Sequence, residues 1–303
     1  MPPNDSSDGR VSAQEAMAPL WRSLVGTLRT AEADLRLDRP GSVHDFRLAA
    51  RRLRSDIVGM RPLLDTDECD VLTEQLRATG LQVSGARDAE VIERRVERLL
   101  VGQPQDEDLV ATRDLLHRLV AGSYEQSREQ ALDYLDSEEY DALTRRLERF
   151  ADLPPWQSRA RVSAKKALKP LLRRQWSRLR AASRKAVATE PGPVRDERLH
   201  DARKAAKRTR YLAEALTPVL GRRAEKIGKV AASAQKVLGH YQDAVITTAL
   251  LADAGEHAFR DGENGFVLGR MQAEEAAAMT GMVTDFTHLV EAMERKTYQR
   301  WLG

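Results

Sequence analysis

The sequence predicts an all-α protein, and three observations support this class. Apolar residues recur at helical spacing, as at Tyr140, Leu143, Leu147 and Phe150, whereas few segments alternate with period two. The apolar residues are mostly Ala, Leu and Val, and aromatic residues reach only 5% of the chain, which suits amphipathic helices better than sheets. Turn-forming residues also divide the chain into helix-length pieces. A hydrophobic fraction of 42% in 303 residues is enough for a buried core.

The expected elements follow one another between four breaks, at residues 39–41, 102–108, 152–155 and 190–193. Residues 1–13 are polar, and we expect a disordered tail there. We expect one domain over residues 14–302, built from a first helical repeat at 14–152 and a second at 159–302. The Pro154–Pro155 break near the middle of the chain is the best boundary between the halves.

An internal repeat links these two halves. Residues 43–55 match residues 199–211 at an offset of 156, with seven of thirteen positions identical. Residues 19–31 match residues 170–182 at an offset of 151, with six of thirteen identical. Two shorter matches follow in the same order. Each half is therefore expected to be one copy of about four helices, and two antiparallel bundles related by a pseudo-two-fold axis are the natural packing.

The repeated helix carries a one-sided row of cations at spacings of three and four residues. The first row is His44, Arg47, Arg51 and Arg54, and the second is His200, Arg203, Lys207 and Arg210, flanked by Lys204 and Arg208. Like charges at these spacings destabilise a helix by about 0.2–0.5 kcal/mol per pair. A bound anion would offset that cost. The duplicated rows therefore favour anion binding over the alternative of a solvated helix face.

The charge of the chain is small in total and uneven along its length. The net charge is +3, but residues 159–210 hold 18 Lys and Arg against four acids, so the rest of the chain carries −11. Such an uneven distribution of charge along the chain predicts a polyanionic partner. Four arginines of the first repeated helix, if it packs beside the histidine helix, would extend the basic wall: Arg22, Arg29, Arg173 and Arg180. Lys165, Lys166 and Lys169 precede Pro170, which leaves their direction open.

The histidine–aspartate pairs, His44–Asp45 and His200–Asp201, raise a metal site as an alternative. Adjacent residues on a helix do not face each other, and no zinc or calcium motif accompanies the pairs. We therefore expect no metal, no cofactor and no catalytic residue, and no nucleotide or nucleophile motif is present. Charged imidazoles instead suit phosphate, which predicts tighter binding at pH 6 than at pH 8.

Two motifs resemble the CHAD family, the conserved histidine α-helical domain. They are His-x-x-Arg-x-x-x-Arg-Arg-x-Arg at residues 44–54 and His-x-x-Arg-Lys-x-x-Lys-Arg-x-Arg-Tyr at residues 200–211. Residues 238–244, Leu-Gly-His-Tyr-Gln-Asp-Ala, look like the family's Leu-Gly…Gln-Asp segment, and the likeness covers about residues 14–302. The resemblance implies two four-helix bundles around a basic central channel that binds inorganic polyphosphate, as a binding module without catalysis.

Carried over by position, the resemblance implies a set of polyphosphate contacts in both halves. They are Arg22, Arg29, His44, Arg47, Arg51, Arg52, Arg54 and Arg87 in the first half, and Arg173, Arg180, His200, Arg203, Lys204, Lys207, Arg208, Arg210 and His240 in the second. Many relatives place a histidine where Tyr241 stands here, so either His240 or the Tyr241 hydroxyl could serve at that turn.

Further expectations concern alternative functions, partners and cellular location. Nucleic acid is the main alternative ligand, but single strands usually need aromatic stacking platforms, and the rows offer only Tyr211. A metal-dependent phosphate-handling enzyme that uses the histidine–aspartate pairs is the other alternative. The single cysteine, Cys69, fits a reduced cytosol, and neither a secretory signal nor a membrane span is expected. The resemblance points to polyphosphate granules and to enzymes of polyphosphate metabolism as candidate partners.

Overall fold

The computed structural model describes residues 11–83, 94–104, 107–121, 124–295, 298 and 301–302. These residues are all-helical apart from turns and two isolated β-bridges, which confirms the predicted fold class. The first half contains α1 (Ala13–Arg36), α2 (Ser42–Met60), η1 (Arg61–Leu63), α3 (Thr66–Gln82), α5 (Glu107–Ala121), α6 (Tyr124–Leu135) and α7 (Glu138–Asp152). The second contains η2 (Ser158–Arg161), α8 (Ala164–Val187), α9 (Pro193–Leu220), α10 (Arg222–Asp261) and α11 (Phe266–Met293).

Local sequence explains where the main helices begin. Ser12 caps α1, because its hydroxyl accepts a hydrogen bond from the Glu15 amide at 3.2 Å while the Glu15 carboxylate accepts one from the Ser12 amide at 2.9 Å. Gly41 precedes α2 with φ +80°, a left-handed conformation that suits glycine. Pro193 opens α9 at a position where no amide donor is needed. The breaks expected at 39–41, 152–155 and 190–193 are confirmed.

Helix α8 continues through Pro170, which settles the direction of the lysines before it. Lys165, Lys166 and Lys169 lie on the same helix as Arg173. Pro170 is the seventh residue of α8, as Pro19 is of α1. Proline has no amide hydrogen, so each helix lacks a backbone hydrogen bond only within its first turns.

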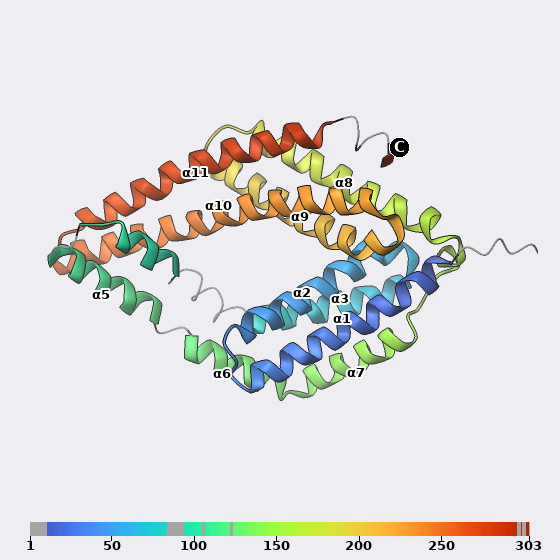
Figure 1. The fold of residues 1–303 in the computed structure, drawn as a ribbon. Helices are drawn as coiled ribbons and strands as arrows, with labels where there is room; N and C mark the ends of the chain where they lie inside the picture. Colours follow the sequence, from blue (N-terminus) through green and yellow to red (C-terminus); the bar gives the residue numbers. More distant parts are fainter. Residues whose placement is uncertain are drawn as a thin grey trace, which may run out of the picture.

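The helices form two groups that pack against each other (Figure 1). In the first group α2 lies between α1 and α3, and α7 covers α1. In the second α9 lies between α8 and α10, and α11 packs on α10 and α8. The groups meet where α2 contacts α9 and α1 contacts α8. One hydrophobic core runs through both groups, with Trp21 and Trp176 buried in equivalent helices.

Backbone hydrogen bonds join the segment before α1 to the segment before α8. Ser12 and Ser163 form an antiparallel bridge, in which the Ala13 amide donates to the Val162 carbonyl at 3.1 Å and the Ala164 amide to the Val11 carbonyl at 3.0 Å. A second bridge joins Leu64 to Trp156.

The first half departs from the expected four helices. Helix α10 is 40 residues long, whereas its counterpart α3 has 17, and the far end of the α10–α11 hairpin extends beyond the main core. Residues 94–101 and α5, which belong to the first half, cover this extension and share a second core with it. That core includes Leu100, Leu116, Leu251 and Met271. Figure 1 shows α5 beside the distal ends of α10 and α11.

Candidate functional site

The two repeated helices, α2 and α9, bring their cation rows together. They approach closely at one end, where a Cβ on Gly59 would lie only 3.1 Å from a methyl carbon of Leu212. The apolar face of each helix is buried in the core, with Phe46 and Leu53 on α2 and Ala202 and Ala206 on α9. The rows are left half-buried at the contact between the helices.

Lys207 marks the centre of this contact. The pKa of Lys207 falls from its ordinary 10.5 to about 7, and burial is the largest cause. The remaining causes are four positive charges from both helices, namely Arg51, Arg203, Arg47 and Arg208. Burial is the main reason that the charge of Lys207 is disfavoured, and the four arginines of α2 and α9 add to it because they are near enough to act on its amine. The structure therefore brings cations of α2 and α9 close to one another.

Two arginines extend the positive field along the helices. Burial lowers the pKa of Arg203, with Asp243 opposing the shift and Arg51 adding to it. The Arg203 guanidinium lies against α10, with its Nε 3.7 Å from where a Cβ on Gly239 would stand. Burial also lowers the pKa of Arg54, and the nearby charge of Arg208 adds to that effect.

We call six residues the central basic cluster: Arg47, Arg51, Arg54, Arg203, Lys207 and Arg208. The Nε atoms of Arg51, Arg54 and Arg203 are buried and have no hydrogen-bond partner among the described residues. Buried donors in proteins are normally paired. Donors of this kind, held in a positive field, are suited to an oxyanion.

Arg52 and Arg210 belong to a different network at the end of the cluster. Both bind Glu214, with N–O distances of 3.1 Å for Arg52 and 2.7 Å for Arg210, and both lie over the ring of Tyr211. Asp56, fully buried, lies 3.9 Å from Arg52. Arg52 thereby joins α2 to α9, while the contacts of Arg210 lie within α9.

The predicted histidines occupy unequal environments. His200 is half-buried, and its Nδ1 lies 2.8 Å from Oε1 of Gln242 on α10. His44 is half-buried at the equivalent place on α2. His240 is exposed, while Tyr241 is buried and donates its hydroxyl to Asp196 at 2.5 Å. The Tyr241 hydroxyl is thus engaged in a contact between α9 and α10.

The arginines predicted to bind from the first helix of each half lie mostly beside carboxylates. Three of them pair with carboxylates of the helices that close each group. Arg22 lies 3.8 Å from Asp152, Arg29 lies 2.9 Å from Glu32 and 3.8 Å from Glu148, and Arg180 pairs with Glu294. Arg173 is exposed, Lys204 is exposed and 3.3 Å from Asp201, and Arg87 lies outside the described residues. The contribution of these residues to ligand binding stays a prediction, since three of the arginines are described in ion pairs and Arg173 is exposed.

Sequence reasoning missed two arginines of α8 that approach the cluster. Arg174 and Arg178 stand four residues apart on one helix face, and the pKa of Arg178 is lowered by burial and then by the charges of Arg174 and Arg208. Their spacing within the acid-free run was a usable signal. The repeat does not reveal them, because the equivalent positions of α1 hold Ser23 and Thr27 in place of cations.

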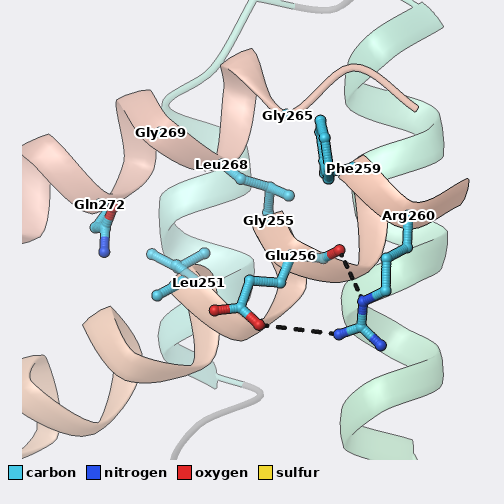
Figure 2. A pocket seen from close by; sticks show the side chains of 10 residues that line it. Leu251, Gly255, Glu256, Phe259, Arg260, Gly265, Leu268, Gly269 and Gln272 are labelled. Atoms are coloured by element: carbon cyan, nitrogen blue, oxygen red, sulfur yellow. Dashed lines mark hydrogen bonds and ion pairs between the residues drawn. The ribbon is translucent and has the colours of Figure 1, made fainter. Parts of the chain in front are cut away.

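A cavity of about 550 Å³ opens elsewhere, between α10 and α11 near the tip of their hairpin (Figure 2). Its walls carry Leu251, Phe259 and Leu268. Arg260 is the one cation among the described residues that line it, and lies 3.9 Å from Glu256. It begins about 12 Å along α10 from Asp243, at 1.5 Å per residue. The cavity therefore lacks the charge of the central basic cluster and is separate from it.

An all-helical fold with opposed cation rows defines a candidate anion-binding module. The family model of the CHAD domain matches residues 20–252, and the chain belongs to that family. Two solved structures share the fold. "PptA from Streptomyces chartreusis" has a TM-score of 0.76 at 19% identity, over 93% of this chain and 100% of that one. The CHAD domain from the plant Ricinus communis has a TM-score of 0.64 at 18% identity, over 91% and 93%.

Two curated relatives from strains of Mycobacterium tuberculosis, the uncharacterized proteins MT2285 and Rv2226, are each 29% identical over 279 residues. The match covers 91% of this chain and 50% of theirs, so the chain spans about half the length of these relatives. None of the described helices is long and apolar enough to cross a membrane. Among the same residues, no group of three His, Cys, Asp or Glu side chains could hold a metal ion.

Proposed function

We propose that the chain binds inorganic polyphosphate, without turnover, in a basic channel between α2 and α9. The observation that carries this proposal is the lowered pKa of Lys207, caused by burial and by arginines from both helices. Such a field is costly for the protein alone and is relieved by a bound polyanion. Membership of the CHAD family, whose resemblance implies polyphosphate binding, supports the same ligand.

Approximate two-fold symmetry of the channel is part of the proposal. At the repeat offset of 156, Arg51 corresponds to Lys207 and Arg47 to Arg203. The charge of Arg51, the counterpart of Lys207, lowers the pKa of Lys207. The repeat also makes two further electrostatic effects equivalent, that of Arg47 on Lys207 and that of Arg51 on Arg203. The bridge between Ser12 and Ser163 also joins counterparts, at the offset of 151. Contacts between counterparts are what a two-fold axis through the α2–α9 interface requires.

The ligand must match a linear row of donors. Polyphosphate carries about one charge per phosphate along an unbranched chain, and arginine offers a planar fork to phosphate oxygens. The half-buried guanidinium groups of Arg51, Arg54 and Arg203 supply such donors along the interface. Release of counterions would make binding fall steeply with salt.

Nucleic acid fits this site less well than polyphosphate. The aromatic ring nearest the rows, Tyr211, is 1% exposed and lies beneath Arg52 and Arg210, so it offers no face for a base. The histidine–aspartate pairs also suit binding better than metal-assisted hydrolysis, because Asp45 is exposed on the far side of its helix turn and Asp201 pairs with Lys204.

The direct test reverses the charge at the centre of the cluster. We expect R51E/K207E to abolish binding of medium-length polyphosphate in a titration while the helical circular dichroism stays unchanged. The control, R222E/K226E, makes the same change of charge at two exposed cations of α10 and should bind like the parent. Equal affinity of R51E/K207E and the parent would refute the channel assignment. Release of orthophosphate during the incubation would refute the absence of turnover.

We further propose that the protein meets polyphosphate in the cytoplasm, at granules, where polyphosphate-metabolising enzymes would be its partners. Co-sedimentation with isolated granules tests this placement, and loss of co-sedimentation in R51E/K207E is the expected result.

A further inference from the structure

A small basic pocket lies beside the central basic cluster, between the end of α2 and α8. Its volume is about 210 Å³, and its walls include Gly59, Arg61, Arg174, Gln175 and Arg178. Gly59 permits the close approach of α2 to α9, as its missing side chain leaves room for Leu212. The pocket is therefore built where the end of α2 and η1 face α8, and α9 packs close to the same glycine.

The pocket is continuous in charge with the cluster. Arg178 lines the pocket, and its pKa is lowered by burial, by Arg174 and by Arg208, a member of the cluster. Arg208 in turn lowers the pKa of Arg54. A path of positive charge thus runs from the α2–α9 interface across Arg208 to α8.

The pocket also lacks compensating acids. None of the described residues that line it is an aspartate or a glutamate. Arg61 pairs with Asp70 at 2.5 Å, but neither Arg174 nor Arg178 has a carboxylate within 4.0 Å among the described residues. Two exposed guanidinium groups that share a wall without a counter-charge suit a phosphate oxyanion.

This feature occurs at one end of the site only. The counterparts of Arg174 and Arg178 on α1 are Ser23 and Thr27, and the Thr27 hydroxyl donates to the Ser23 carbonyl at 2.8 Å. The counterpart of Arg61 is Thr217, whose hydroxyl donates to the Ala213 carbonyl at 2.7 Å. The other end therefore has neutral side chains turned to their own helices.

We propose that this pocket is a second phosphate subsite, which binds the end of a polyphosphate chain where it leaves the central basic cluster. The inference rests on the proposed function and adds an asymmetry to it. A long chain would occupy both the cluster and the pocket, whereas tripolyphosphate would occupy the cluster alone. Chain length is thus recognised by whether the ligand reaches α8.

The test compares R174Q/R178Q with K166Q/K185Q, which removes two other exposed cations from the same helix. For long-chain polyphosphate we expect about a tenfold loss of affinity in R174Q/R178Q and less than a twofold change in the control. For tripolyphosphate we expect less than a twofold change in both variants. Thermal melting of each variant checks that α8 stays folded.

Two results would overturn the subsite. One is an equal effect of the two variants on long chains, and the other is an equal loss for tripolyphosphate and long chains in R174Q/R178Q. Either result leaves the proposed function standing if R51E/K207E still abolishes binding. If the parent binds neither ligand, the proposed function fails first.

Discussion

Polyphosphate binding should take up protons near neutral pH, because Lys207 is only partly charged in the free protein. Its pKa is about 7, so about half of the molecules carry a neutral Lys207 at pH 7. Phosphate oxygens beside the amine favour its charged form and raise its pKa on binding. We therefore expect uptake of about half a proton per complex at pH 7 from this residue alone.

The same linkage sets the pH dependence of the affinity. Below pH 6 Lys207 is charged in both states and contributes no slope. Above pH 7 the free protein loses the proton that the complex keeps, so the affinity falls by up to about tenfold per pH unit. From pH 6 to pH 8 the expected loss from Lys207 is about tenfold.

Isothermal titration calorimetry in two buffers of different ionisation enthalpy measures the proton uptake. K207R is the matched variant, because a guanidinium keeps its charge throughout this range. H44Q/H200Q removes the imidazoles, which also face the ligand in the proposed site. At pH 8 we expect uptake to persist in H44Q/H200Q and to fall in K207R, which keeps the imidazoles but loses the titrating amine. Undiminished uptake by K207R at pH 8 would refute the role of Lys207.

Two predictions concern stability without ligand. The folded pKa of Asp56 is raised to about 7, mainly by burial, so stability falls as pH rises from about 4 to 7. In urea unfolding, the free energy of unfolding of D56N should exceed that of the parent by on the order of 4 kcal/mol at pH 8 and by little at pH 4. A D56N whose stability depends on pH as the parent's does would contradict this. The folded pKa of Lys207 is lowered instead, so stability rises from pH 7 to 10.5. The free energy of unfolding of K207M should exceed that of the parent by on the order of 5 kcal/mol at pH 6 and by less at pH 9.5, and a loss at pH 6 would contradict this.

The central basic cluster could be predicted because its signal is local and repeated. Helical spacing puts Arg47, Arg51 and Arg54 on one face whatever the fold, and the second copy shows the same row. Their meeting across the α2–α9 interface followed from the expectation that duplicated helices pack about a two-fold axis.

Repetition alone did not separate binding from structure. Arg29 and Arg180 are counterparts at the offset of 151, yet each pairs with a carboxylate of its own helical group, Glu148 or Glu294. A duplicated ion pair leaves the same trace in the sequence as a duplicated binding residue. The partner carboxylates lie more than 100 residues away, so spacing along one helix does not reveal them.

The rest of the fold depends on contacts that no local pattern encodes. The apolar periodicity around Leu115 and Leu116 predicted helices but not their partner, which is the α10–α11 extension of the other half. Arg174 and Arg178 could not be predicted either, because they have no counterpart in the repeat. Only the fold brings them near Arg208 and into one pocket with Gly59.

The most direct test of the basic channel is a binding titration of the parent chain with medium-length polyphosphate and with single-stranded DNA of equal charge, at low and at physiological salt. We expect a strong preference for polyphosphate that survives physiological salt, because the cations of the rows are half-buried and Tyr211, the aromatic residue of the rows, has no exposed face for a base. Equal binding of both polymers that collapses together as salt rises would mean generic electrostatic attraction, and would contradict a shaped channel.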